Sequence, residues 1–205
     1  MSQVIGLFPT PFMRSERLLG AGLVAALVAE AEAFASQGNH RSAALTHTEP
    51  VLPASAAFAE ASALIAPRLV EFGMLLFGES LPWAIKAMWL NVLENGGHQA
   101  VHNHANSFVS GVVYLSRPHE SAHTVFLKGL GGRDFVFGNS NARTTQGPFN
   151  ADKWITPPAE PGDLVLFPSY LLHEVPVNQG GRRISLAFNA VPQRLDSWGY
   201  ATSFS

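Results

Sequence analysis

The chain contains no cysteine, and this absence removes several kinds of chemistry at once. Disulfide bonds, thiolate metal ligands and a cysteine nucleophile are all excluded. Any bound metal must therefore be held by nitrogen and oxygen atoms. The absence of cysteine does not by itself distinguish an oxidising from a reducing compartment.

Charged residues are also scarce, at 14% of the 205 residues, and the formal net charge is only -2. No long run of like charge occurs, so the sequence lacks the basic surface expected of a protein that binds nucleic acid or an anionic membrane. We therefore expect a small-molecule or peptide partner, with no nucleic acid and no membrane. The sequence does not indicate an oligomeric state.

Long hydrophobic runs are missing as well. The apolar stretch at residues 18–28 is too short to span a bilayer, and it lacks the basic region and cleavage pattern of a signal peptide. A cytoplasmic location is the default expectation. Neither a Gly-x-Ser-x-Gly elbow nor a glycine-rich phosphate loop is present, which disfavours hydrolase and nucleotide-dependent functions.

What the sequence does have is enough apolar residues, 47%, to bury one sizeable core, and this predicts a single domain over residues 1–205. Apolar side chains at helical spacing predict helices at about residues 19–34 and 58–76, the second ending at Gly78. This helical part spans about residues 15–80. The polar stretch between the two helices, residues 39–49, is interpreted as a loop.

From Pro82 onward the periodicity of apolar residues changes to two, which is typical of strands. Strands are predicted at residues 83–90, 108–115, 124–127, 135–137, 163–167, 171–177 and 182–191. Short strands separated by glycine, proline and asparagine indicate a sandwich, jelly roll or barrel. We therefore expect a mainly β fold with N-terminal helices and a β core at about residues 82–192. The long segment at residues 128–154 is either a substrate-binding lid or a plain surface excursion.

Three of the eight histidines form a pattern that favours metal binding. His102 and His104 are two residues apart, so on a strand both imidazoles point to the same face and can reach one ion. His173, on a distant predicted strand, supplies a third ligand and leaves the other positions to water and substrate, as in a mononuclear non-haem iron site. The trio predicts a metal-dependent oxygenase. His98, four residues before His102, is a candidate spare ligand.

The last predicted strand carries Arg183 and Ser185 on one face and apolar residues on the other. If the apolar face packs in the core, the guanidinium and the hydroxyl point into the same cavity as the metal. A buried arginine needs a carboxylate or an equivalent acceptor. Either a dicarboxylate co-substrate or an internal acid such as Glu174 satisfies that need.

The second half of the chain contains a series of motifs that, taken in order, indicates a protein family more strongly than any single motif does. The motifs are Trp89-Leu-Asn91, His102-Asn-His104-Ala-Asn106-Ser107, Ser110-Gly111-Val-Val-Tyr114-Leu115, Pro161-Gly162-Asp163, Leu166-Phe167-Pro168-Ser169 and Arg183-Ile-Ser185-Leu-Ala-Phe188-Asn189, with Gly96, His173, Pro176 and Asn178 between them. In this order, over about residues 85–192, the chain resembles the 2-oxoglutarate- and iron(II)-dependent oxygenases of bacteria and phages, which are prolyl-hydroxylase-like in outline. The opening Leu7-Phe8-Pro9-Thr10-Pro11 is also similar to that family.

The resemblance implies a double-stranded β-helix, a jelly-roll barrel buttressed by helices. It also implies Fe(II), 2-oxoglutarate as co-substrate, and dioxygen. His102 matches the first iron ligand and His173 the distal histidine. Arg183 matches the residue that binds the far carboxylate of 2-oxoglutarate, with Ser185 as its hydroxyl helper and Tyr114 at a strand position that often touches the same carboxylate.

One position departs from the wider superfamily, whose usual triad is His-x-Asp with a distal histidine. Here His104 occupies the carboxylate position, so three histidine ligands would leave the iron more cationic. Two other ligand arrangements stay open, namely His104 with Asn106, or His102 with water. Two other functions stay open as well: a three-histidine cupin-like dioxygenase that uses no 2-oxoglutarate, and a non-catalytic metal-binding jelly roll.

Overall fold

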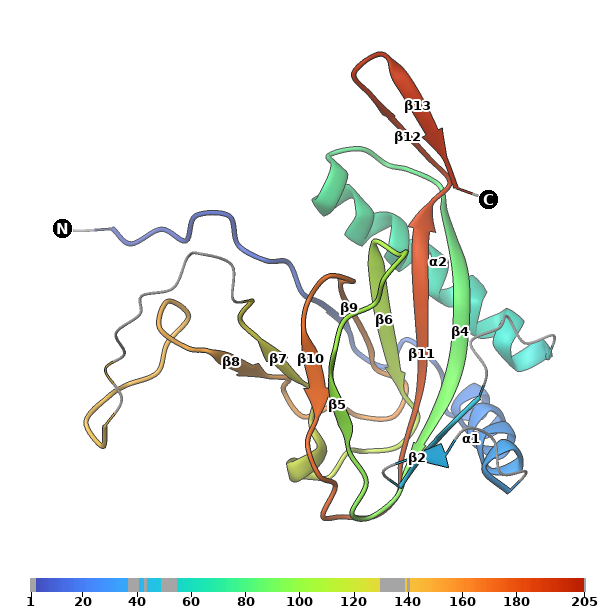
Figure 1. Cartoon of the computed structure of the whole chain (residues 1–205). Coiled ribbons are helices and arrows are strands. Elements are labelled where there is room, and N and C mark those ends of the chain that lie inside the picture. The colour runs from blue at the N-terminus through green and yellow to red at the C-terminus, as the bar shows by residue number, and fades with distance from the viewer. Residues whose placement is uncertain are drawn as a thin grey trace.

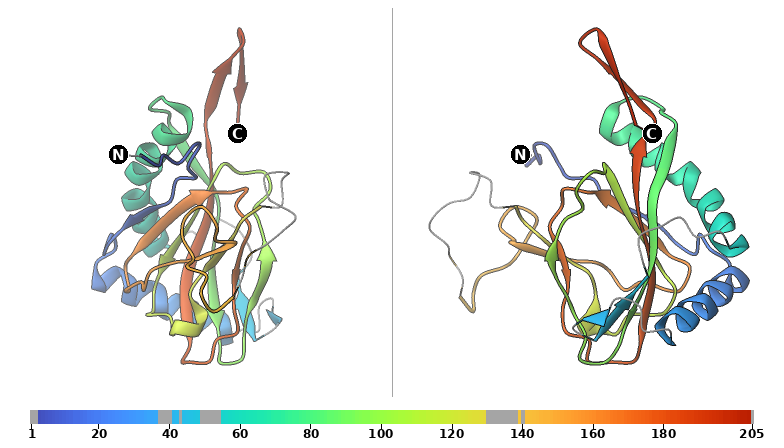
Figure 2. Two further views of the ribbon diagram at one scale, coloured as in Figure 1. Left: turned by 90° about the vertical axis from the view of Figure 1, so that its left-hand side faces the viewer. Right: turned by 45° about the vertical axis from the view of Figure 1, so that its right-hand side comes forward.

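The computed structural model describes residues 3–36, 41–42, 44–48, 55–129, 139 and 141–204. Two antiparallel sheets form a sandwich, and two helices lie on the outer side of the larger sheet (Figures 1 and 2). The larger sheet has the order β1 (Met13–Ser15), β9 (Leu164–Pro168), β6 (Val109–Tyr114), β11 (Arg183–Pro192), β4 (Trp83–Leu93), β3 (Leu45–His47) and β2 (Arg41–Ser42). The smaller sheet has the order β5 (Gln99–His102), β10 (His173–Val175), β7 (Val125–Leu127) and β8 (Lys153–Ile155). A short 3-10 helix, η1 (Glu120–Ala122), precedes β7.

Both predicted helices are present. α1 covers Ala21–Ser36 and α2 covers Ala56–Phe77. The hydroxyl of Ser55 accepts a hydrogen bond from the Phe58 N–H at 3.3 Å and so caps the start of α2. At the other end Gly78 adopts a φ of 71° and its N–H bonds to the Met74 carbonyl at 2.9 Å, as in a glycine C-cap. No described helix is long and apolar enough to cross a membrane.

The main core lies between the two helices and the larger sheet. It is built from buried apolar side chains of α1, α2, β4, β6, β9 and β11, among them Leu27, Ile65, Met88, Leu166 and Phe188. The predicted alternation of β11 is confirmed, since Ile184, Leu186 and Phe188 belong to this core. The opposite face of β11, with Arg183 and Ser185, therefore turns toward the smaller sheet.

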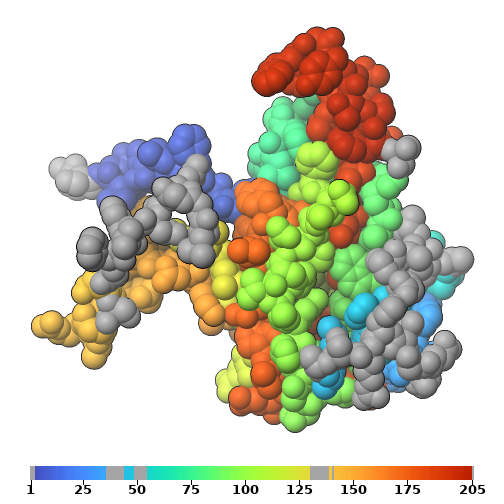
Figure 3. Space-filling model, viewed as in Figure 1, coloured from blue at the N-terminus to red at the C-terminus, as the bar shows by residue number. Residues whose placement is uncertain are grey.

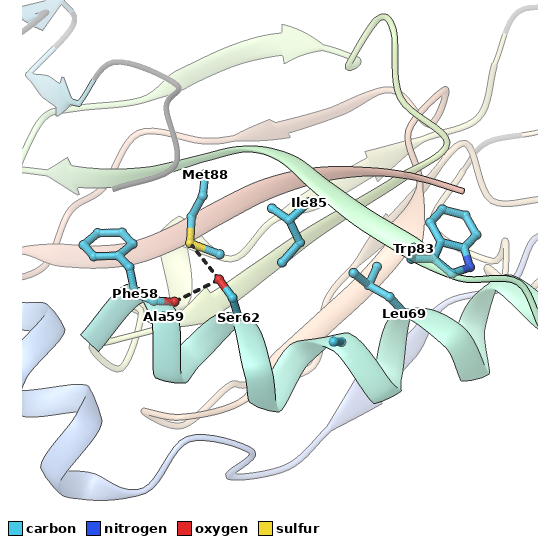
Figure 4. Close-up of a pocket in the computed structure, with 8 residues that line it drawn as sticks. Phe58, Ala59, Ser62, Leu69, Trp83, Ile85 and Met88 are labelled. Atoms are coloured by element: carbon cyan, nitrogen blue, oxygen red, sulfur yellow. Dashed lines mark hydrogen bonds between the residues drawn. The ribbon is translucent and has the colours of Figure 1, made fainter. Parts of the chain in front are cut away.

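A cavity of about 340 Å³ lies between α2 and β4, on the side of the larger sheet away from the smaller one (Figure 4). Its lining is mostly apolar and includes Phe58, Leu69, Trp83 and Ile85. The hydroxyl of Ser62 in its wall already donates to the Phe58 carbonyl at 2.8 Å. This cavity therefore lacks convergent polar groups that could perform chemistry.

The structure corrects several strand predictions. The stretch at residues 39–49 was expected to be a loop, but it contains β2 and β3, and β3 pairs with β4. The end of the long segment at residues 128–154 is not a loop, because Lys153 and Trp154 belong to β8, which pairs with β7. The predicted strand at residues 135–137 and the middle of this segment, residues 130–138, lie outside the described residues.

Beyond the predicted β core, the chain forms a hairpin that projects from the body (Figures 1 and 3). Its strands are β12 (Arg194–Ser197) and β13 (Tyr200–Ser203). The two turn residues, Trp198 and Gly199, have positive φ angles of 53° and 82°, as a type I′ turn requires. The hairpin carries no candidate site residue.

Candidate metal and co-substrate site

The three histidines singled out by the sequence lie together, and their possible ligand atoms are all within 4.8 Å of one another. His102 ends β5 and His173 begins β10, where the two residues are register partners with ring centroids 4.2 Å apart. The Nε2 atoms of His104 and His173 are 3.3 Å apart. Three side chains from two separated parts of the sequence therefore converge on one point.

His104 reaches the cluster in a different way from the one expected. β5 ends at His102, so His104 lies two residues past the strand rather than on the same strand face. Its backbone N–H donates to the Ser169 carbonyl at 3.0 Å, which fixes the position of this connection against the loop after β9. The pair His102 and His104 thus depends on tertiary contacts as well as on local spacing.

In two of the imidazoles Nδ1 lies against a backbone carbonyl, while Nε2 lies near another side chain, Gln99 at 3.5 Å for His102 and His104 at 3.3 Å for His173. The Nδ1 atom of His102 lies 2.7 Å from the Ala100 carbonyl, and that of His173 lies 2.9 Å from the Leu171 carbonyl. A carbonyl only accepts hydrogen bonds, so both Nδ1 atoms carry the hydrogen and both Nε2 atoms keep a lone pair. Metal-binding histidines in proteins are commonly oriented in this manner.

The electrostatics of the cluster favour neutral rings. Burial, together with the neighbouring rings of His173 and His102, lowers the pKa of His104 to about 3. Burial likewise lowers the pKa of His173 to about 4, with His102 adding to the effect and the bond to Leu171 opposing it. Neutral imidazole is the form that binds metal, so these two rings need not lose a proton at neutral pH.

This donor set fits iron(II). Imidazole nitrogen suits iron, zinc, copper and nickel, and three such ligands leave open positions for a co-substrate and dioxygen. No carboxylate joins the cluster among the described residues. His98, the candidate spare ligand, is exposed and lies outside the cluster.

A second cavity, of about 30 Å³, is lined by the three histidines and by residues of the facing sheet. Arg183 lies in the wall of this cavity and is almost completely buried. Its Nη1 donates to the Ser185 hydroxyl at 3.3 Å and its Nη2 to the Thr124 hydroxyl at 3.4 Å, while its Nε has no partner among the described residues. Burial lowers the pKa of this guanidinium. A buried cation with only hydroxyl partners is a site that an anionic ligand would stabilise.

An internal acid does not fill that role in the part of the chain that the structure describes. Glu174, the acid considered from the sequence, pairs instead with Lys153 at 3.1 Å. No described ion pair includes Arg183. Of the two interpretations of this arginine, the described contacts favour a carboxylate brought by a ligand.

Tyr114 supports Arg183 from behind rather than lining the cavity. The centroid of its ring is 5.4 Å from the guanidinium carbon, a distance that allows a cation–π contact. Its hydroxyl lies 3.2 Å from the Thr124 hydroxyl, and Thr124 does line the cavity. Sequence reasoning missed Thr124, because a single hydroxyl residue directly before a three-residue strand carries no pattern.

Trp89, Asn91, Trp154 and Asn178 differ in how they relate to the cavity. Trp89 and Asn91 do line the cavity, and the ring of Trp89 lies 5.6 Å from that of His104. Trp154 instead packs against Phe12 with ring centroids 4.8 Å apart. Asn178 is fully buried and donates to backbone carbonyls, so its role is structural.

The family comparison can now be set beside this geometry. The model of the family described as "Putative 2OG-Fe(II) oxygenase" matches residues 87–189, which include all six candidate site residues. The chain belongs to the 2OG-Fe(II) oxygenase family. The expected oxygenase activity and the expected cofactors, Fe(II) and 2-oxoglutarate, are therefore those of its family. No curated protein sequence matches this oxygenase.

Solved structures show the same fold. The α-ketoglutarate-dependent epimerase SnoN from nogalamycin biosynthesis aligns with a TM-score of 0.67 at 19% identity, covering 95% of this oxygenase and 81% of SnoN. A Pseudomonas putida prolyl-4-hydroxylase aligns with a TM-score of 0.59 at 19% identity, over 88% and 92% of the two chains. HygX from Streptomyces hygroscopicus, with nickel and 2-oxoglutarate bound, gives 0.62 at 17% identity, over 89% and 83%. The predicted double-stranded β-helix buttressed by helices is confirmed.

Proposed function

We propose that this oxygenase binds Fe(II) through His102, His104 and His173, and binds 2-oxoglutarate through Arg183 with Ser185. The observation that carries the proposal is that three imidazoles and a buried guanidinium line one cavity from the two opposed sheets, and that no acid among the described residues pairs with this guanidinium. The primary substrate is a small molecule or a peptide.

The three histidines bind iron from two different parts of the fold. His102 and His173 present their Nε2 atoms because backbone carbonyls hold the opposite nitrogens, and His104 closes the set from the connection after β5. All three are neutral ligands, so the bound ion keeps its full positive charge and favours an anionic co-substrate. When bound, the iron supplies the redox chemistry with dioxygen that no side chain can perform.

Arg183 orients the co-substrate. Its guanidinium donates to the distal carboxylate of 2-oxoglutarate, and the hydroxyls of Ser185 and Thr124, which now share hydrogen bonds with it, donate to the same group. The Tyr114 ring beneath the guanidinium keeps it in place. Because the histidines line the same cavity, a dicarboxylate anchored at Arg183 turns its keto-acid end toward them.

Aromatic and aliphatic side chains exclude water from the cavity. Phe167 and Val175 line the cavity beside the histidines, and the Phe167 ring lies 4.9 Å from the His173 ring. Excluding water strengthens the charge interactions at Arg183 and protects reactive species from side reactions. Trp89, on the facing sheet, forms the wall next to His104.

The comparisons support the substrate class. One SnoN structure is a complex with nogalamycin RO, and one HygX structure is a complex with hygromycin B. A third relative is a prolyl-4-hydroxylase.

The test is an anaerobic titration of the Fe(II)-loaded protein with 2-oxoglutarate, followed by the weak visible charge-transfer band of the iron chelate. The band should form in the wild type and in Arg182→Met, a matched control whose guanidinium is exposed and pairs with Glu94. Arg183→Met should need at least about tenfold more 2-oxoglutarate, because a charged hydrogen-bonded anchor is lost.

The titration can also overturn the proposal. If iron binds to the wild type and no band forms at any concentration of 2-oxoglutarate, the keto-acid function fails and a three-histidine dioxygenase without 2-oxoglutarate replaces it. If Arg183→Met titrates like Arg182→Met, the carboxylate anchor lies elsewhere.

A further inference from the structure

The third histidine of the cluster lacks the fixed partner that orients the other two. The Nδ1 atoms of His102 and His173 face backbone carbonyls, which accept hydrogen bonds and cannot donate them. The Nδ1 of His104 instead lies 3.5 Å from the side-chain amide of Asn189 on β11. An amide can offer either its NH₂ or its oxygen, so this partner does not impose one tautomer.

Behind Asn189 a row of hydroxyls continues the hydrogen bonding away from the metal site. Among the serines, Ser107 Oγ lies 2.7 Å from Ser169 Oγ, which lies 2.8 Å from Ser110 Oγ. Ser110 Oγ lies 2.8 Å from Asn189 Oδ1, and Asn189 Nδ2 lies 3.5 Å from His104 Nδ1. On the other side of the ring, His104 Nε2 lies 3.3 Å from His173 Nε2. Ser110 and Ser169 are each only 1% exposed, so bulk water does not replace these bonds.

Every donor in this row can point the same way. Each serine donates to the next group, Ser110 donates to Asn189, and the Asn189 NH₂ donates to His104 Nδ1. His104 then carries its hydrogen on Nε2 and donates it to His173 Nε2, whose lone pair is free because its Nδ1 hydrogen is held by Leu171. In this polarity His104 has no lone pair to offer a metal at Nε2.

Metal binding at His104 Nε2 requires the opposite polarity. The hydrogen must sit on Nδ1, which then needs an acceptor, and a half-turn of the Asn189 amide supplies its oxygen. The Asn189 NH₂ then donates to Ser110, and the hydroxyls of Ser110 and Ser169 rotate to donate toward Ser107. Serine hydroxyls can reverse in this way because each both donates and accepts.

We propose that Asn189, backed by Ser110, Ser169 and Ser107, is a positioning residue that sets the tautomer of His104 and thereby makes the third metal ligand available. The inference rests on the proposed function in one respect, because it takes His104 to be a ligand. It assigns the row of serines a role in metal binding, although none of them belongs to the histidine cluster.

The experiment is ¹⁵N NMR of histidine-labelled protein at pH 7.5, first without metal and then loaded with Zn(II), a diamagnetic ion that binds imidazole. In the wild type, His104 should carry its hydrogen on Nε2 without metal and on Nδ1 with zinc, whereas His102 and His173 keep Nδ1–H throughout. In Asn189→Asp the partner only accepts, so His104 should already carry its hydrogen on Nδ1 without metal.

Zinc affinity provides the second readout. Asn189→Leu should lower it by about 10- to 100-fold, the range seen when an outer partner of a metal-binding histidine is removed. Asn189→Asp should restore it to the wild-type level or above, a rescue that a merely structural role would not give. Asn141→Leu, in an exposed segment away from the cluster, should bind zinc like the wild type.

Two results overturn the inference: Nδ1–H at His104 in the metal-free wild type, or an Asn189→Leu variant with unchanged zinc affinity. A His104→Ala variant separates this failure from that of the proposed function. If His104→Ala binds zinc as tightly as the wild type, His104 is not a ligand and both proposals lose that residue. If it binds weakly while Asn189→Leu binds normally, only the role of Asn189 fails. No keto acid enters these measurements, so they do not depend on 2-oxoglutarate binding.

Discussion

His102 and His173 lie opposite each other across β5 and β10, one at the end of its strand and the other at the start. The ladder of the smaller sheet therefore sets the separation of these two rings. His104, which follows the strand, depends on contacts with Ser169 and Asn189 for its position. The sheet thus positions two of the candidate ligands, and a loop positions the third.

Replacing a sheet-borne ligand should nearly abolish metal binding. We expect His173→Ala to lower Fe(II) affinity by more than about 100-fold, which exceeds the loss expected from removing an outer partner. Anaerobic calorimetry with Fe(II) measures this. His98→Ala, which changes an exposed histidine outside the cluster, is the control. Equal losses in the two variants would contradict the assignment.

Removing the buried guanidinium should not weaken the fold. Arg183 is buried with hydroxyl partners and no described acid, so Arg183→Met exchanges a desolvated charge for an apolar chain of similar length. We expect the free energy of unfolding to stay the same or to rise by about 1 kcal/mol. Urea unfolding of the metal-free protein checks this. A loss above about 2 kcal/mol would show that the arginine has a stabilising partner.

Acid should destabilise the metal-free protein through the histidine cluster. The pKa values of His104 and His173 are lowered to about 3 and about 4 in the folded state, against 6.5 in the unfolded chain. Between these values the unfolded chain binds more protons, so the stability that is present above pH 6.5 is lost as the pH falls. At pH 5 the loss relative to pH 8 should be about 2 kcal/mol for each ring.

Urea unfolding at pH 8 and pH 5 in the presence of a chelator measures this loss. His104→Gln should remove about half of the difference, because a ring that titrates only in the unfolded chain is gone. His98→Gln should leave the difference unchanged. A pH dependence that is the same in His104→Gln and wild type would show that other groups cause it.

Gly111 on β6 should not tolerate a side chain. A Cβ atom there would collide with the ring of Phe188 and with Leu166, both in the main core. We expect Gly111→Ala to lower the free energy of unfolding by about 1–3 kcal/mol, the usual range for overpacking. Gly22→Ala in α1 is the matched control, since nothing lies within 4 Å of its added carbon. That variant should gain about 0.5–1 kcal/mol.

β11 shows what the sequence can predict. Its strict alternation of polar and apolar residues places Arg183 and Ser185 on one face and Leu186 in the core, and the structure agrees. Such a pattern is readable because each strand residue has only two directions in which to point. The resemblance to the family also predicted that His102 and His173 lie together, whereas His104 joins them from beyond the end of β5.

Other features depend on tertiary contacts and left no trace in the sequence. β2 and β3 are two and three residues long, too short to show a period, and form where β4 offers a free edge. Thr124 gains its place beside Arg183 only because β7 and β11 come together across the sandwich. The position of His104 beyond β5 likewise follows from where the ladder with β10 stops.

The two halves of the candidate site stand on different sheets, with His102 and His173 on the smaller and Arg183 on the larger. Under the function proposed above, one end of the diacid meets the histidines and the other meets Arg183, so the distance between the two sheets sets the length of the diacid that binds. We expect a diacid one carbon shorter or longer than 2-oxoglutarate to bind less tightly. Substitutions that alter the packing between the sheets, even far from the cavity, should then change the selectivity among dicarboxylates.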